Sequence, residues 1–381
     1  MQPTRAAIGT WSGGRFMRFG EPLADERMRA LLRPGEGIDT VITADVYGEG
    51  EADRMLGSAL KGRERDSFCL VGAIGHDFYT GQREGAKGFP RFTDPRLRGE
   101  SEYGAYIRMA TQRSLQRCGA DRFDLLLLHN PDRRGYTSAA VWEGMRAVRE
   151  AGLADELGVA PGPANGFTLD LIDCLERYSE QIAWAMIIFG PLEPWPGELV
   201  LEAARAHNVS LITRVVDYGG LLHGDLRDEG AFAAGDHRGF RPHGWVAAGR
   251  ATIERMRPIA ERRGLTMLQL ACAWNLAQAP VACVAPTLVQ ESGPGARAIE
   301  AQRAELATVP ALDALLEQEV AEIRRIGDNS GCMALKGASA EHEGEPQADR
   351  WALDEHLLAL AQRWSIDPER DLGRRELSGA R

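Results

Sequence analysis

The chain of 381 residues is long enough for one large α/β barrel of about 250 residues with insertions, or for two ordinary domains. Hydrophobic residues make up 44% and charged residues 26%, which is typical of a globular protein. No apolar run reaches the roughly 18 to 20 residues of a membrane span. The net charge of -10 argues against a nucleic-acid surface, because phosphate binding needs a clustered basic field. We therefore expect a small-molecule partner, with no nucleic acid and no membrane.

The first ten residues lack the long apolar core of a secretory signal, so we expect a cytoplasmic protein. The six cysteines lie far apart, without a CxxC pair. Those in apolar segments are predicted to be small buried hydrophobic residues. No HxH or HExxH spacing occurs, so we predict no metal site.

Strands and helices alternate from the N-terminus onward. The first predicted elements are a strand at Ala7–Trp11, a helix at Asp25–Leu32, a strand ending at Val41–Thr43, a helix at Glu51–Leu60 and a strand at Phe68–Val71. The next segment, His76–Glu100, is too polar for a core and too long for a simple connection. Such a loop on a rigid scaffold usually carries function.

The alternation continues to Pro286. A helix at Tyr103–Cys118 precedes the continuous apolar strand Phe123–His129, and such apolarity is typical of parallel strands that are buried on both faces. The remaining predictions are helices at Ala139–Glu150, Leu169–Tyr178, Glu198–Ala206, Trp245–Arg263 and Met267–Ala277, and strands at Leu157–Ala160, Trp184–Phe189, Ser210–Val216 and Val281–Pro286, with a long polar insertion at Gly219–Gly244.

Eight strands that alternate with helices predict an α/β fold of the (β/α)8 TIM-barrel type, with long loops at its mouth. A doubly wound sheet is the weaker alternative. We assign residues 1–325 to the barrel and 326–381 to a C-terminal tail with one amphipathic helix, Trp351–Trp364. This tail either caps the barrel mouth or serves as a docking or oligomer element, which leaves a homo-oligomer open.

Seven short motifs occur in the order that aldo-keto reductases show, and the chain resembles a divergent member of that family. They are Gly9-Thr10-Trp11, Thr43–Gly48, Leu56-Gly57, Asp124–Asp132, Leu157-Gly158-Val159, Leu268–Ala277 and Val281–Pro286. Each motif is weak alone, but the ordered set is specific. The resemblance implies hydride transfer from NADPH at a site with an acidic residue, a tyrosine, a lysine and a histidine.

Two of these four site positions are retained. Tyr47 matches the tyrosine and His129 matches the histidine, but Ile42 stands at the acidic position and Ala73 at the lysine position. A tyrosine with a pKa near 10 is a poor acid at neutral pH unless a neighbouring cation or relay adjusts it. In the family the lysine and the acidic residue supply that adjustment.

The cofactor positions that the resemblance identifies also differ. Ala160 and Pro161 stand where the family often has Ser-Asn, and Met186 and Phe189 stand where it has Gln and Tyr. Phe189 stays a candidate to stack on a nicotinamide. Arg297 is a weak candidate for a cofactor phosphate, since a solvated arginine at a helix start explains it better. We expect either no cofactor or NADP(H).

Tyr47 and His129 are the predicted catalytic pair, because a neutral tyrosine and histidine can polarise a carbonyl or relay a proton. Candidate substrate-binding residues, at or near the ends of predicted strands, are Trp11, Asp45, His76, Asp77, Asn130, Glu193, Arg214 and Asp217. Packing or solvation is the alternative for each of them. The charged residues of the long loops indicate a polar or anionic ligand, or simply a solvated surface.

Three functions stay open. The first is proton transfer on a sugar-like or other small carbonyl compound, in an isomerase, dehydratase or lyase that has lost efficient hydride transfer. The second is an NADP(H)-dependent oxidoreductase with an atypical site, in which His76 or another loop residue replaces the lysine. The third is a non-catalytic binding subunit, and the presence of both Tyr47 and His129 counts against it. The sequence favours the first only slightly over the second.

Overall fold

The computed structural model describes residues 1–85, 88–162, 167–226, 232, 235–241, 244–293, 295–310, 314–329 and 353–372. Within them, eight parallel strands form one sheet in chain order. They are β1 (Ala7–Gly9), β2 (Thr40–Ile42), β3 (Cys69–Ile74), β4 (Phe123–His129), β5 (Ala154–Ala160), β6 (Ile182–Ile188), β7 (Ser210–Arg214) and β8 (Val281–Ala285). Ala6 pairs in parallel with Val284 and brings the first strand to the last. The predicted TIM barrel is confirmed.

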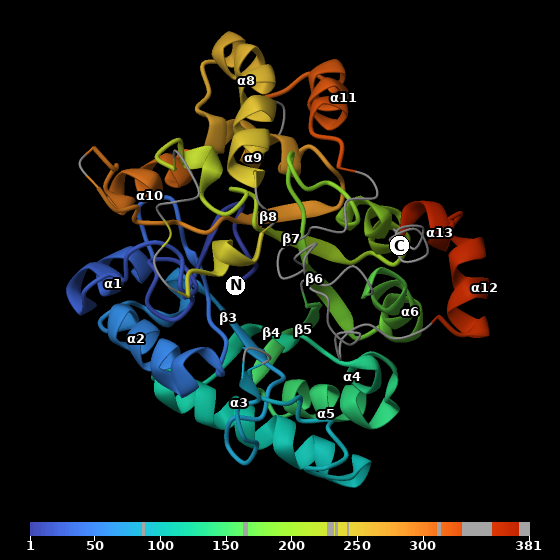
Figure 1. Cartoon of the computed structure of the whole chain (residues 1–381). Helices are drawn as coiled ribbons and strands as arrows, with labels where there is room; N and C mark the ends of the chain where they lie inside the picture. Colours follow the sequence, from blue (N-terminus) through green and yellow to red (C-terminus); the bar gives the residue numbers. More distant parts are fainter. Residues whose placement is uncertain are drawn as a thin grey trace.

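Helices surround the strands (Figure 1). They are α1 (Asp25–Leu32), α2 (Glu51–Leu60), α3 (Tyr103–Cys118), α4 (Arg133–Thr137), α5 (Ala139–Glu150), α6 (Thr168–Tyr178), α7 (Leu201–Ala206), α8 (Trp245–Arg263), α9 (Met267–Leu276), α10 (Ile299–Ala307), α11 (Glu317–Ile326), α12 (Glu355–Arg363) and α13 (Pro368–Asp371). No helix among the described residues is both long and apolar enough to cross a membrane.

The alternation of side chains along each strand creates two apolar layers. On β4, Leu125 and Leu127 belong to the buried cluster inside the barrel, whereas Leu126 and Leu128 belong to the cluster between the strands and the helices. Both sets are fully buried, because a parallel strand in a barrel is covered on both faces. The same alternation decides which residue at the end of each strand faces the mouth.

Helices α4, α11 and α13 were not predicted, and for α10 only a helix start near Arg297 was expected. Helix α4 has only five residues and no apolar stripe; it begins at an N-cap, Asp132, whose side chain accepts from the N–H of Gly135. Helix α11 does carry a short amphipathic pattern, in which Ile323 and Ile326 are buried. This pattern is the sequence signal for α11.

The described part of the C-terminal tail lies on the outer helix layer, beside α6 (Figure 1). Helix α12 packs there through a buried cluster that contains Leu357, Leu360, Ala361, Leu169, Ile172 and Ala203. Helix α13 reaches the loop after β6, where the Asp371 carbonyl accepts a hydrogen bond from the Trp195 indole. The tail therefore has two described helices instead of the one predicted, and α12 covers α6, not the mouth.

This docking can be tested with two leucines on one helix. Leu360 is fully buried, whereas the Leu358 side chain is 43% exposed. A carboxylate at position 360 cannot be buried without a large desolvation cost, so Leu360→Asp is expected to release α12 locally. Limited proteolysis with trypsin at Arg363 should then be at least about tenfold faster than in the wild type, since roughly 1.5–3 kcal/mol of leucine burial is lost. Leu358→Asp is the matched control, and equal cleavage of both variants would contradict the docking.

Candidate active site

A small cavity of about 40 Å³ lies at the carboxyl ends of the strands. Its lining residues are Trp11, Met17, Phe19, Tyr47, His129, Ala160, Met186, Arg214, Val215 and Thr287. The strand ends and following loops of β1, β2, β4, β5, β6, β7 and β8 all contribute, so the cavity lies on the barrel axis. This is the end of the fold at which TIM-barrel enzymes place their sites.

Tyr47 and His129 meet in this cavity. The centroids of their two rings are 5.7 Å apart, and the ring planes are perpendicular. His129 is the last residue of β4 and pairs with Ala160 of β5, which fixes its place at the rim. Tyr47 follows β2 in a tight turn, and the left-handed backbone of Gly48 and Gly50 lets the chain continue into α2. The predicted pair therefore shares one cavity.

The pKa values of the two side chains are shifted in opposite directions. Burial raises the pKa of Tyr47, and the nearby Arg214 guanidinium opposes that rise. Burial holds the pKa of His129 well below its ordinary value, and His76, Arg214 and Arg91 act in the same direction. His129 is therefore neutral at physiological pH, and its Nδ1 atom has no hydrogen-bond partner in the described part of the chain. A protonated tyrosine faces a neutral imidazole.

Arg214, the last residue of β7, is the cation of the cavity. Its Nη2 atom donates a hydrogen bond of 2.7 Å to the Pro161 carbonyl, across the end of β6. Burial lowers the pKa of Arg214 and the neighbouring Tyr47 raises it, but a guanidinium stays charged in proteins. The sequence had placed Arg214 only among the candidate substrate-binding residues.

Ile42 and Ala73 occupy the positions that carry charge in the resembled family. Both are buried, and both belong to the apolar cluster inside the barrel, next to Met186 and Leu127. Apolar packing therefore surrounds the two positions at which the resemblance implies a charged pair. The cation beside Tyr47 comes from β7 instead of β3.

His76 and Asn130 form a second layer around His129. The His76 ring lies 5.5 Å from the His129 ring, centroid to centroid. Its Nδ1 atom donates to the Phe89 carbonyl at 2.8 Å, so Nε2 is left to accept from the Asn130 amide at 3.2 Å. Arg91 also holds Asn130, because its Nε donates to the Asn130 carbonyl at 2.7 Å. His76 therefore positions its neighbours, and neither of its ring nitrogens is free.

Two predicted acidic candidates are engaged in ion pairs. Burial alone would raise the pKa of Asp77. The hydrogen bond from Thr80 and the ion pair with Arg98 outweigh it and hold that pKa below its ordinary value. Glu193 pairs with Arg241, with N–O distances of 3.1 and 3.0 Å, and both side chains are buried. Neither carboxylate lines the mouth cavity.

The two other acidic candidates, Asp217 and Asp45, contact neighbouring residues of the chain. Asp217 accepts hydrogen bonds of 2.6 Å from the backbone N–H groups of Gly220 and Thr287, and so ties the loop after β7 to the end of β8. Asp45 is buried beside Tyr79, whose hydroxyl lies 3.4 Å from Asp45 Oδ2. Burial, reinforced by Asp53, raises the pKa of Asp45 well above its ordinary value.

The roof of the cavity was not predicted beyond Trp11. Asp236 accepts from the backbone N–H of Gly20 at 2.9 Å and pairs with Arg238, which also pairs with Glu291. These buried contacts join the loops after β1, β7 and β8. Phe19 and Met17, which follow Trp11 in the Gly-rich turn, are the apolar residues of this roof. Their spacing in a loop gives no periodic signal, so only the fold reveals them.

The predicted cofactor residues lie elsewhere. The Phe189 ring is buried in the layer between strands and helices, with its centroid 5.0 Å from that of Trp274, and it does not line the cavity. Arg297 pairs with Glu305 and donates to the His223 carbonyl. Three consecutive backbone N–H groups after β8, those of residues 287 to 289, donate to the side chains of Asp217, Ser12 and Gln302.

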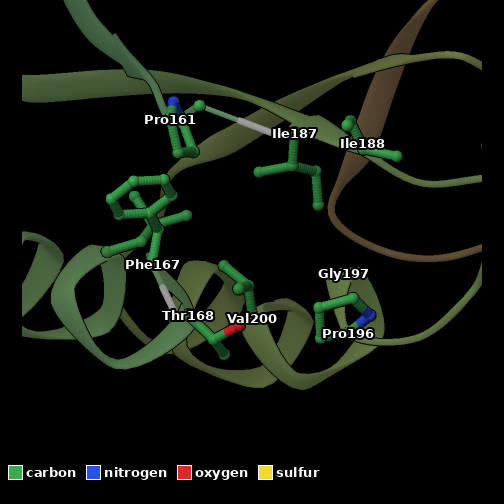
Figure 2. A pocket seen from close by; sticks show the side chains of 10 residues that line it. Pro161, Phe167, Thr168, Ile187, Ile188, Pro196, Gly197 and Val200 are labelled. Carbon is green, nitrogen blue, oxygen red and sulfur yellow. The ribbon is translucent and has the colours of Figure 1, made fainter. Parts of the chain in front are cut away.

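A second cavity of about 50 Å³ is lined by residues of β6, α6 and the segments that follow β5 and β6 (Figure 2). Its lining residues are Pro161, Gly162, Phe167, Thr168, Leu171, Ile187, Ile188, Pro196, Gly197 and Val200, none of which is titratable. Ile187 faces the helix layer, whereas its neighbour Met186 faces the barrel interior, so this pocket lies outside the ring of strands. It offers apolar space but no acid or base. Among the described residues, no group of three or more His, Cys, Asp and Glu side chains is arranged to hold a metal ion.

A TIM barrel with a tyrosine and a histidine at its mouth defines the class of protein as a TIM-barrel enzyme. The chain belongs to the aldo/keto reductase family, whose model matches residues 6–324. This confirms the family that the sequence motifs indicated.

Individual relatives are distant. A probable voltage-gated potassium channel subunit beta from Arabidopsis thaliana is 24% identical over 302 residues, which cover 75% of this chain and 85% of that protein. The aldo-keto reductase YhdN of Bacillus subtilis (strain 168) is 25% identical over 285 residues, or 73% of this chain and 79% of that protein. The glycerol dehydrogenase AKR11B4 from Gluconobacter oxydans has a similar structure, with a TM-score of 0.64 at 22% identity, over 86% of this chain and 92% of that one. That last likeness shows the fold alone.

The buried histidine of the second layer predicts an acid-sensitive fold. Burial, with Arg91 nearby, lowers the pKa of His76 from 6.5 to about 3. Between those two values the unfolded chain binds a proton at this residue and the folded chain does not, so stability falls as the pH falls. His76 should contribute up to about 1.4 kcal/mol per pH unit to this loss below pH 6.5.

Urea unfolding of the wild type and of His76→Gln, measured from pH 8 to pH 4, tests this expectation. The free energy of unfolding of the variant should fall less steeply below about pH 6.5, while the two slopes should agree above pH 7. Parallel curves across the whole range would contradict it.

Proposed function

We propose that this protein catalyses proton transfer on a small carbonyl compound without a nicotinamide cofactor, as an isomerase, dehydratase or lyase. The observation that supports this proposal best is the enclosed cavity in which the Tyr47 and His129 rings lie 5.7 Å apart beside Arg214. One group is a proton donor, the second is a neutral base, and the third is a fixed positive charge. That set is sufficient for enolisation.

The reaction follows from these three side chains. The neutral imidazole of His129 takes a proton from the carbon next to the substrate carbonyl, and the C–H electron pair becomes the C=C bond of the enol. The Tyr47 hydroxyl gives its proton to the carbonyl oxygen. Arg214 stabilises the negative charge that develops on oxygen during these transfers. If the deprotonated carbon carries a hydroxyl group, His129 returns its proton to the former carbonyl carbon, the hydroxyl proton goes back to Tyr47, and an isomer results. If the next carbon carries a hydroxyl group, that group leaves as water with the proton from His129, the enol proton goes back to Tyr47, and an unsaturated carbonyl product results.

We infer that nicotinamide chemistry has been lost, because the residues at the expected cofactor positions do not fit a nicotinamide dinucleotide. Phe189 packs on Trp274 and is not at the mouth. The N–H groups of residues 287 to 289, which could otherwise cradle a phosphate, already donate to side chains of the chain itself. Arg297 is paired with Glu305. We therefore derive no hydride step.

An NADP(H)-dependent oxidoreductase is the second candidate, because the matched family and the bacterial relative are named as reductases. In that case Arg214, and not His76, would take the place of the lysine, since both ring nitrogens of His76 are engaged. Carbonyl-dependent oxidation of NADPH by the purified protein would establish this function. A non-catalytic subunit is the third candidate, favoured only by the name of the plant relative.

Deuterium exchange tests the proposed proton transfer without knowledge of the natural substrate. Dihydroxyacetone and hydroxyacetone are incubated with the protein in D2O, with no cofactor, and the loss of C–H signal is followed by NMR. The wild type should accelerate exchange, and Tyr47→Phe and His129→Gln should each reduce the enzymatic rate by about 10² to 10⁴-fold.

Tyr178→Phe is the matched control. The Tyr178 hydroxyl donates to the Thr137 carbonyl, away from the cavity. This variant should exchange at the wild-type rate. Equal rates for Tyr47→Phe and the wild type, on any compound that the wild type does exchange, would refute the proposed role of Tyr47.

A further inference from the structure

The mouth cavity contains a cation without a matching anion. Its lining residues include Arg214 but neither Asp nor Glu. The buried arginines of the mouth loops, by contrast, are paired: Arg238 with Asp236 and Glu291, and Arg241 with Glu193. In the described part of the chain, Arg214 forms no ion pair, and its hydrogen-bond acceptor is the neutral Pro161 carbonyl.

The Arg214 side chain is partly buried. A charge that is removed from water without a partner anion is costly, so an anionic ligand at this position would be stabilising. The Arg214 Nε atom is buried without a hydrogen-bond partner among the described residues. The groups that raise the pKa of Arg214 are the tyrosines Tyr47 and Tyr136, and no carboxylate is among them. The guanidinium therefore keeps both its charge and a free donor.

The carboxylates near the mouth are committed elsewhere. Asp77 is held by Arg98, and Glu193 by Arg241. Asp217 accepts two backbone N–H groups, and Asp45 lies in the separate buried contact with Tyr79. None of the four lines the cavity. An anion that pairs with Arg214 is therefore none of these four carboxylates.

A second arginine adds to the positive field. Arg91 holds the Asn130 backbone, and together with Arg214 it lowers the pKa of the adjacent His129. Arg214 thus provides a positive charge at the site, in a chain whose net charge is -10. Of the common anions, a carboxylate matches the planar fork of a guanidinium. The cavity of about 40 Å³ limits the ligand to a few heavy atoms unless the roof moves.

We infer that the substrate is a small 2-oxo or 2-hydroxy acid, whose carbonyl or hydroxyl group lies between Tyr47 and His129. Its carboxylate, on the neighbouring carbon, is bound by Arg214, so that the same guanidinium also faces the oxygen that becomes negative. This inference rests on the proposed function of the same cavity and narrows it, because it replaces a neutral sugar-like compound with an anionic one. The apolar residues Trp11, Met17 and Phe19 then cover the carbon skeleton.

Matched acids and amides provide the test. Pyruvate is compared with pyruvamide, and lactate with lactamide, in calorimetric titrations and by quenching of tryptophan fluorescence, since Trp11 lines the cavity. The wild type should bind each acid at least about tenfold more tightly than its amide, because a charge-assisted bidentate pair replaces a neutral hydrogen bond. Arg214→Gln should abolish this preference, and Arg214→Lys should keep part of it, since lysine retains the charge without the fork.

Arg257→Gln is the control for loss of an arginine. Arg257 pairs with Glu254 on the surface of α8, and both side chains are largely exposed. This variant should keep the wild-type preference for acids. If Arg214→Gln fails to fold, thermal unfolding of the wild type provides the test. The acids should raise the Tm of the wild type, and the amides should not.

Two results would overturn the inference: equal binding of acids and amides by the wild type, or an undiminished preference for acids in Arg214→Gln. Failure of the proposed function gives a different result. If the proposed function holds, Tyr47→Phe binds the acids but loses deuterium exchange; if it fails, Tyr47→Phe exchanges as fast as the wild type. If Tyr47 is required for exchange on dihydroxyacetone but no acid preference exists, only the substrate class is wrong.

Discussion

The register of the parallel strands is the constraint on which the site depends. Ile188 of β6 pairs with Arg214 of β7, and His129 of β4 pairs with Ala160 of β5, so these residues end their strands at the same edge of the barrel. A shift of one residue would turn each side chain to the other face. Tyr47 reaches the same place from the turn after β2. Strand pairing thus places His129 and Arg214, and the turn after β2 adds Tyr47.

The charge of the site comes from one side of the barrel. Ile42 and Ala73 belong to the apolar cluster inside the barrel, and Arg214 at the end of β7 supplies a cation to the mouth cavity. The imidazole of His129 stays neutral because burial and nearby cations disfavour its protonated form. We propose that this arrangement suits proton transfer on an anionic carbonyl compound better than hydride transfer. The side chains of Asp217 and Gln302 accept backbone hydrogen bonds from Thr287 and Val289 and so stabilise the segment after β8.

The sequence predicts the barrel well because each strand is an apolar run between helices with clear periodicity. It also identifies Tyr47 and His129, which stand in recognisable motifs at strand ends. The sequence does not determine which way Arg214 and Phe189 face. A shift of one residue in strand pairing would turn a side chain from the barrel mouth to the helix layer. The roof contacts of Asp236, Arg238 and Glu291 join loops far apart in the chain, and no local pattern encodes them. The docking of α12 on α6 is long-range in the same way.

The most direct measurement is a titration of the purified protein with NADPH and NADP+, followed by tryptophan fluorescence and confirmed by calorimetry. Loss of nicotinamide chemistry predicts no saturable signal up to millimolar cofactor, while Tyr47 and His129 still support exchange on carbonyl compounds. Binding in the micromolar range, followed by carbonyl-dependent oxidation of NADPH, would contradict it. The tyrosine, histidine and arginine of the mouth would then belong to an oxidoreductase with an unusual cation.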